Sequence, residues 1–160
     1  MSIAVGDKVP AGEFGVMGAD GPEKVSTEEL FGGKKVVLFS VPGAFTPTCH
    51  AKHLPGFVEN AAALNAKGVD TIACLAVNDV FVMGAWGQAS NVGDAVVMLA
   101  DGNGTFTKAL GLDFDGSGFG LGTRGQRFAM IVDDGVVSAL EIEQPGQFTA
   151  SSAENILSQL

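Results

Sequence analysis

Continuous apolar segments are the clearest pattern of hydrophobic and polar positions along the chain. Three such segments occur, at residues 34–41, 69–77 and 95–101. They are rich in Val, Leu and Ala, and an uninterrupted apolar run of this length is typical of a strand that is buried on both faces of a sheet. The sequence therefore predicts three central β-strands.

Helical spacing follows the first of these segments. From Cys49 to Leu64, apolar residues recur every three or four positions, which predicts a helix that Pro55 should kink near its first turns. A strand, a helix and a second strand over residues 36–77 form a unit whose two strands should be parallel. This unit is the expected centre of the fold.

The remaining pattern predicts an α/β fold. Four further elements are expected: a helix over 79–88 capped by Asn78 or Asp79, a short helix closed by Gly111, a β-hairpin over 126–143 about Asp134-Gly135, and a last helix opened by a Ser151-x-x-Glu154 capping box. The glycine-rich residues 1–33 predict short strands or turns. Alternation of strands and helices implies one domain over residues 1–160, with a mixed central sheet and helices on both faces.

Composition narrows the class of protein. Of the 160 residues, 46% are hydrophobic and 17% are charged, a balance that excludes disorder and allows a single core. The net charge of −9 argues against nucleic acid or an anionic membrane as a partner. No apolar run reaches the roughly 18 residues of a membrane span. The start of the chain lacks the pattern of a signal peptide, so a cytoplasmic location is expected.

One short stretch carries the candidate chemistry, "PGAFTPTCH" at residues 42–50. Cys49 lies between a buried strand and a helix, where unpaired backbone N–H groups favour a thiolate over a thiol. Prolines restrict the loop before it. The Thr46 hydroxyl could face the sulfur and either donate to it or hold a substrate oxygen, or else Thr46 or Thr48 only caps the helix. The location favours a reactive thiol over a packed one.

These residues resemble a known family. Pro42, Thr46 and Cys49 form P-x-x-x-T-x-x-C, and "VPGAFTPTCHAKHLPGF" is similar to the active-site segment of the peroxiredoxins. Together with "LAVNDVFVMGAW" and "GQRFAMIVDDGVV", it resembles the type II (peroxiredoxin five-like) branch. The resemblance implies a thioredoxin-like fold, a homodimer, and reduction of hydrogen peroxide, alkyl hydroperoxides and often peroxynitrite by thiols. Neither a metal nor another cofactor is expected.

The resemblance also implies a role for each site residue. Cys49 would be the peroxidatic cysteine and would become a sulfenic acid. Arg127 would stabilise both the thiolate and the leaving oxygen, although without the family it reads as a surface arginine. Thr46 would orient the peroxide, and Pro42 would shield the site from water.

Three further positions have supporting roles in this interpretation. His53, in the family's "HLPG" motif, is expected to order the start of the helix, and Arg124 is a weaker candidate near the substrate. Cys74 stands 25 residues after Cys49, where some type II relatives place a resolving cysteine. A disulfide between the two would require the helix to unwind. If Cys74 is a core residue instead, an external thiol such as glutathione, glutaredoxin or thioredoxin resolves Cys49.

Other interpretations of the thiol have less support. A zinc site would use Cys49, His50, His53 and Cys74, but the chain has no C-x-x-C pair. A Cys–His hydrolase with His50 or His53 as base lacks a third orienting residue. A non-enzymatic redox sensor or interaction module is the second hypothesis, and a turnover assay separates it from an enzyme.

Two glycine motifs and a tryptophan complete the candidates. "GLGTRG" (120–125) precedes a strand rather than a helix, so it does not predict a dinucleotide site. "DFDGSG" (113–118) begins like a calcium loop, but Arg124 occupies its twelfth position, where a glutamate is needed. Both runs are expected to form one flexible loop leading to Arg127. Trp86 is expected either in the core or at a dimer contact.

Overall fold

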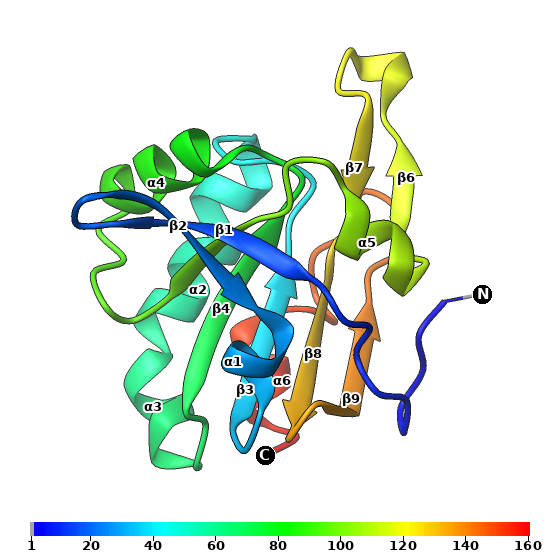
Figure 1. Ribbon diagram of the computed structural model, residues 1–160. Helices are drawn as coiled ribbons and strands as arrows, with labels where there is room; N and C mark the ends of the chain where they lie inside the picture. Colours follow the sequence, from blue (N-terminus) through cyan, green and yellow to red (C-terminus); the bar gives the residue numbers. More distant parts are fainter. Residues whose placement is uncertain (1) are drawn as a thin grey trace.

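A seven-stranded mixed sheet forms the centre of the computed structural model, which describes residues 2–160 (Figure 1). The strands lie in the order β2 (Gly21–Ser26), β1 (Glu13–Gly18), β5 (Val97–Ala100), β4 (Thr71–Ala76), β3 (Lys35–Ser40), β8 (Phe128–Asp133) and β9 (Val136–Ile142). The three predicted central strands, β3, β4 and β5, are parallel to one another, and β1, β2, β8 and β9 pair antiparallel. The predicted mixed sheet is confirmed.

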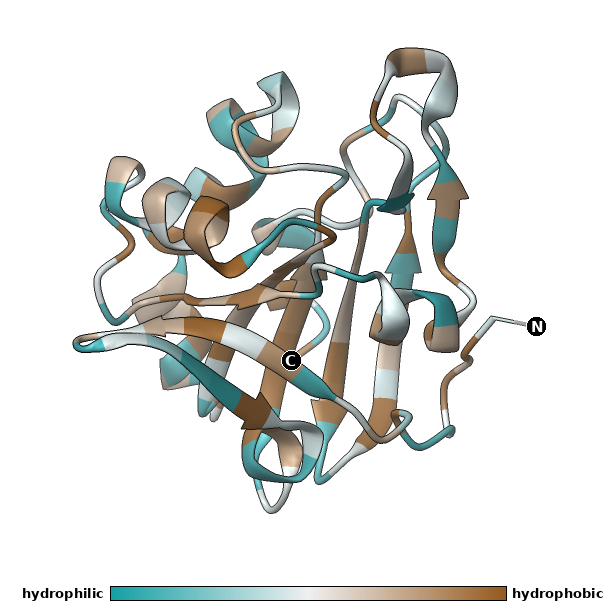
Figure 2. Cartoon of the chain, turned by 45° about the horizontal axis from the view of Figure 1, so that its top comes forward, coloured by the Kyte–Doolittle hydropathy of each residue, from teal (hydrophilic) through white to brown (hydrophobic). Residues whose placement is uncertain are grey.

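Helices cover both faces of this sheet. One face carries a π-helical turn η1 (Cys49–His53), α2 (Leu54–Glu59), α3 (Ala61–Ala66), α4 (Val80–Ala89) and α6 (Ala153–Leu157), and the other carries α1 (Thr27–Phe31) and α5 (Thr105–Leu110). Within β3, Val37 and Phe39 pack in the first core while Val36 and Leu38 pack in the second. Burial on both faces explains the continuous apolar pattern, which Figure 2 shows along the central strands.

The helix after β3 contains, just after its first turn, a wider turn than an α-helix has. The Leu54 N–H donates to the carbonyl of Cys49, five residues earlier, instead of four. Pro55, which has no N–H to donate, follows at the start of α2. The kink expected at Pro55 is therefore a π-helical turn just before it, a feature that is frequent at functional sites.

The N-terminal region contains a helix that the pattern did not predict. Helix α1 spans five residues, too few to show a hydrophobic period. Its start was nevertheless readable, because Ser26 and Glu29 form a reciprocal capping box, with bonds of 3.1 and 3.2 Å. The other predicted caps are confirmed for α4, where Asp79 accepts from the Val82 N–H, and for α5, where Gly111 has a left-handed φ of 73°.

The predicted capping box of the last helix is wrong by one residue. Ser152 is the N-cap of α6, and its hydroxyl accepts from the Asn155 N–H at 3.2 Å. Ser151 is fully buried, and its hydroxyl donates to Glu143 at 2.7 Å. A buried carboxylate therefore takes the serine that the local motif assigned to the helix.

The glycine runs form a hairpin and not the flexible loop that was expected. Strands β6 (Asp113–Asp115) and β7 (Thr123–Gly125) pair with each other as a separate two-stranded sheet, joined by the 3-10 turn η2 (Ser117–Phe119). This hairpin projects beyond the main sheet (Figure 1). Strands of three residues are too short to show alternation, so the glycines dominated the pattern.

No helix among residues 2–160 combines the length and the apolar character needed to cross a membrane.

Candidate active site

Cys49 lies in the first turn of the helix that follows β3. Residues 47 and 48 are already helical, and the first turn closes through the His50 N–H, which donates to the Thr46 carbonyl at 2.8 Å. The Cys49 side chain is fully buried, and its thiol is free. The unpaired N–H groups of this turn give the sulfur the partly positive surroundings that the sequence predicted.

Arg127 supplies the nearest charge to this sulfur. Its Nη2 donates to Cys49 Sγ at 3.0 Å, and its Nη1 donates to His53 Nδ1 at 2.8 Å. The two donors of one planar guanidinium thus end on two residues of the same helical turn. The structure brings together Cys49, His53 and Arg127, three of the residues that the resemblance singled out, and Arg127 is not the surface arginine of the simpler interpretation.

His53 is held in a single neutral form. Its Nε2 lies 2.9 Å from the carbonyl oxygen of Ser151. A carbonyl only accepts, so Nε2 carries the proton, and Nδ1 is free to accept from Arg127. Burial, and then the charge of Arg127, lowers the pKa of His53 from 6.5 to about 3. The imidazole therefore orients Arg127 without competing with it as a cation.

Thr46 and Pro42 form the loop side of the site. The Thr46 hydroxyl donates to the Gly43 carbonyl at 2.7 Å, which fixes the hydroxyl and leaves its oxygen able to accept. Donation from Thr46 to the sulfur, one of the expected alternatives, is not observed, and Thr48 makes no capping hydrogen bond. The arrangement is suited to accepting a hydrogen bond from a substrate.

Arg124 ties this loop to the hairpin. Its Nη1 donates to the Pro42 carbonyl at 3.1 Å and its Nε to the Leu121 carbonyl at 3.0 Å. A Cβ at Gly43 would lie 2.6 Å from Arg124 Nη1, so a side chain there would displace the guanidinium from the Pro42 carbonyl. Arg124 contacts the backbone beside the site, not Cys49 itself.

A cavity of about 580 Å³ adjoins the guanidinium. It is lined by Pro42 and by Arg127, whose guanidinium donates to the Cys49 sulfur, and also by Phe114, Phe119 and Pro145. Phe119 stands at the tip of the hairpin and is 84% exposed. Sequence reasoning missed these aromatic residues, although two phenylalanines within a glycine-rich stretch are a signal for an exposed apolar contact.

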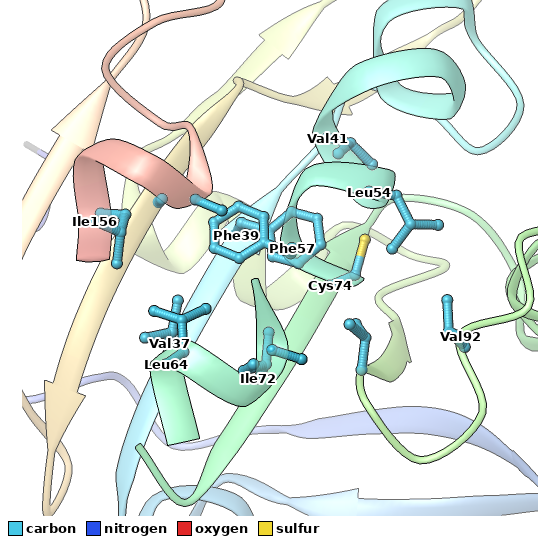
Figure 3. Close-up of a cluster of buried hydrophobic side chains, with 14 of the residues drawn as sticks. Val37, Phe39, Val41, Leu54, Phe57, Leu64, Ile72, Cys74, Val92 and Ile156 are labelled. Atoms are coloured by element: carbon cyan, nitrogen blue, oxygen red, sulfur yellow. The ribbon is translucent and has the colours of Figure 1, made fainter. Parts of the chain in front are cut away.

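Cys74 lies on β4, the middle strand of the parallel set. It pairs with Phe39 of β3 on one side and Met98 of β5 on the other, and its sulfur is surrounded by apolar side chains that include Leu54 and Phe57 (Figure 3). Burial, and then the neighbouring Cys49, raises the pKa of the Cys74 thiol well above its usual value. The thiol is free and poorly suited to attack.

The two histidines are engaged in ways that leave no base for Cys49. His50 Nδ1 accepts from Trp86 Nε1 at 3.0 Å, and His53 is bonded as described above. A Cys–His hydrolase pair is therefore absent from the site. Among residues 2–160, no group of three or more His, Cys, Asp or Glu side chains is arranged to hold a metal ion. Trp86 itself is fully buried and belongs to the core.

A buried thiol at a helix start, held by an arginine on a thioredoxin-like sheet, defines a thiol-redox protein. The family model for redoxins matches residues 4–157. The chain is 54% identical over 164 residues to the chloroplastic peroxiredoxin-2E-2 of Oryza sativa subsp. japonica, with 99% of this chain and 73% of that protein covered. It is 53% identical over 159 residues to peroxiredoxin-2C of the same plant, with 99% and 98% covered.

Solved structures agree with this assignment. The fold superposes on reduced Prx3 of Vibrio vulnificus in complex with H2O2 with a TM-score of 0.94, at 53% identity and with 98% of each chain covered. The chain belongs to the peroxiredoxins, in the type II group of the redoxin family. It is accordingly a thiol-dependent peroxidase.

The low pKa of His53 predicts a loss of stability in acid. The unfolded chain binds the His53 proton near pH 6.5 and the folded chain only near pH 3, so stability falls as the pH drops between these values. At pH 5 the expected cost is about 2 kcal/mol relative to pH 7. Urea unfolding at both pH values checks this, with His53→Gln showing a correspondingly smaller drop. Equal drops in the two proteins would contradict a neutral buried His53.

Proposed function

We propose that the chain reduces hydroperoxides through a sulfenic acid at Cys49. The observation that carries the proposal is the 3.0 Å contact between Arg127 Nη2 and Cys49 Sγ, with the second guanidinium donor fixed by His53. A permanent positive charge at this distance favours the thiolate, which is the reactive form of cysteine.

The reaction is a two-electron oxidation of sulfur. The Cys49 thiolate attacks the terminal oxygen of ROOH, an S–O bond forms, and the O–O bond breaks. The sulfur becomes a sulfenic acid, and the other oxygen leaves as RO⁻ and takes up a proton to give ROH or water. Arg127 stabilises the charge first on sulfur and then on the leaving oxygen. The Thr46 hydroxyl oxygen accepts a hydrogen bond from the peroxide O–H, and Pro42 limits access of water.

Two residues support this geometry without touching the peroxide. His53 directs Arg127, because its Nδ1 accepts from Nη1. Arg124 holds the Pro42 carbonyl and thereby the loop that carries Thr46. Both act on the positions of reacting groups, which must be held within a fraction of an ångström for efficient reaction.

The cavity beside Arg127 supports alkyl hydroperoxides as substrates in addition to hydrogen peroxide. Phe114, Phe119 and Pro145 offer an apolar surface for a hydrocarbon group, and Arg127, which donates to the Cys49 sulfur, lines the same cavity. For hydrogen peroxide, support comes from the Vibrio vulnificus relative, whose structure is a complex with H2O2.

The sulfenic acid is resolved by an external thiol, glutathione with glutaredoxin or thioredoxin. Cys74 is a poor internal alternative, because its thiol is buried in the central strand and its pKa is raised. A disulfide between Cys49 and Cys74 would require the helix at Cys49 to open.

Free thiols and a thiol reductant fit a reducing compartment, and we infer the cytoplasm, although curated relatives include chloroplastic proteins.

A homodimer fits the surface next to the site. Phe45 is 49% exposed and has a left-handed φ of 64°, which is strained for a residue other than glycine. Its ring lies beside His50 and Trp86. An exposed aromatic side chain held in a strained conformation is suited to a contact with a second copy of the chain.

Peroxide should oxidise Cys49 alone. After one equivalent of hydrogen peroxide without added thiol, the intact mass of the wild type and of Cys74→Ser should increase by one oxygen, and Cys49→Ser should show neither this gain nor turnover. A loss of two hydrogens in the wild type but not in Cys74→Ser would instead make Cys74 the resolving residue. Oxidation of Cys49 without turnover in the presence of glutathione and glutaredoxin or thioredoxin would indicate a redox sensor.

Phe119→Ala should reduce the preference for substrates with a hydrocarbon group. The ratio of kcat/KM for cumene hydroperoxide to that for hydrogen peroxide should fall about fivefold, since partial burial of a phenyl ring contributes about 1 kcal/mol. Phe81→Ala is the matched control, because Phe81 is 65% exposed on α4 and does not line this cavity. An unchanged ratio in Phe119→Ala would remove the hairpin from substrate binding.

The wild-type chain should have the mass of a dimer in light scattering, and Phe45→Glu should shift it toward the monomer, because a buried unpaired carboxylate is costly. A monomeric wild type, or a variant that stays dimeric, would contradict a contact at Phe45.

A further inference from the structure

Glu143 is a buried carboxylate to which the proposed reaction gives no role. It follows the last residue of β9, is 8% exposed, and its backbone N–H donates to the Arg127 carbonyl at 2.9 Å. The residue therefore sits directly opposite the arginine that holds Cys49, but its side chain points into the returning chain.

Three donors converge on one oxygen of this carboxylate. Glu143 Oε2 accepts from the Thr149 N–H at 2.7 Å, from the Ser151 N–H at 2.8 Å and from the Ser151 hydroxyl at 2.7 Å. Burial acts to raise the pKa of Glu143, but the hydrogen bonds from Ser151, Thr149 and Ala150 outweigh it and lower the pKa below the usual value. The side chain is thus a charged anchor for residues 149–151.

The anchored segment contacts both Arg127, which donates to the thiol, and His53, which accepts from Arg127. The Ser151 carbonyl accepts from His53 Nε2 at 2.9 Å, on the same residue whose N–H and hydroxyl are bound to Glu143. The Phe148 ring lies 4.9 Å from the His53 ring, and Arg127 Cζ lies 5.9 Å from its centroid. An arginine over an aromatic face at this distance is attracted to the ring.

We propose that Glu143 is a positioning residue for the reaction at Cys49: by anchoring residues 148–151, it fixes the Ser151 carbonyl and the Phe148 ring that hold His53 and Arg127 in place. The inference rests on the proposed function of Cys49. The order of contacts runs from Glu143 through Ser151 to His53, then to Arg127 and the sulfur.

The direction of the effect separates this role from a simple charge effect. Neutralising a nearby carboxylate would by itself favour the thiolate, because it removes a negative charge. Loosening the anchored segment would do the opposite, since Arg127 would then hold the sulfur less firmly. The two explanations therefore predict opposite changes in the thiolate fraction of Cys49 in Glu143→Gln.

The test measures the rate of iodoacetamide alkylation of the Cys49 peptide as a function of pH. In Glu143→Gln, the pH of half-maximal alkylation should rise by about one unit, and the rate with hydrogen peroxide at pH 7 should fall about tenfold, as expected when buried donors lose a charged acceptor. Glu141→Gln is the matched control, because it removes the same charge two residues earlier on β9, where the side chain accepts from Gln159. An unchanged or lowered midpoint in Glu143→Gln would overturn the proposal.

A double variant tests the order of contacts. In a His53→Gln background, Glu143→Gln should cause a smaller shift of the alkylation midpoint, because the contact between Ser151 and His53 is removed and only the contact between Phe148 and Arg127 remains. An equal shift in both backgrounds would show that Glu143 acts independently of His53 and would overturn the relay.

A milder variant covers the case in which Glu143→Gln does not fold. Ser151→Ala removes the hydroxyl donor but keeps the carbonyl that binds His53. The midpoint should therefore rise, as in Glu143→Gln, and the thiolate fraction below the midpoint should fall about twofold to threefold. No shift in folded Ser151→Ala would then count against the proposal. Alkylation involves no peroxide, so it tests the positioning role of Glu143 separately from the proposed function. A Cys49 that is alkylated but never gains oxygen from peroxide would refute the proposed function, whereas the shift of the alkylation midpoint would still decide the role of Glu143.

Discussion

An arginine can hold a buried thiol in this protein because its other donor ends on an uncharged ring. If His53 carried a second proton, on Nδ1, this nitrogen would donate instead of accept, and two positive groups would face each other at the 2.8 Å contact. Burial prevents this, and the Ser151 carbonyl fixes which nitrogen keeps the proton. The geometry around Cys49 therefore depends on a histidine that stays neutral.

The sheet brings the two halves of this arrangement together. Strands β3 and β8 are antiparallel, and Ser40 at the end of β3 pairs with Phe128 at the start of β8. The chain leaves β3 toward Cys49 and enters β8 directly after Arg127. Residues separated by 78 positions therefore meet at the same end of these two neighbouring strands. The Ser40 hydroxyl, which donates to the Gln126 carbonyl at 2.9 Å, fastens this junction.

Much of this arrangement could be read from the sequence, and the failures have physical causes. The buried strands show as continuous apolar runs and the helix at Cys49 as helical spacing. Arg127 was found by resemblance, since an arginine that precedes a strand has no distinctive local signal. Ser151 was misassigned, because a capping motif describes only neighbours in sequence, whereas its real partner is a buried carboxylate eight residues earlier. Long-range polar contacts of this kind leave no local pattern.

The hairpin of β6 and β7 has a consequence for how such a protein can diversify. It hydrogen-bonds as a separate two-stranded sheet, yet its tip lines the cavity next to Arg127. Changes in its length or in its aromatic residues can thus be accepted without altering the strand pairing that positions the thiol. Arg124 at the base of the hairpin still holds the Pro42 carbonyl, so the tip is the part that can change while the base must stay fixed.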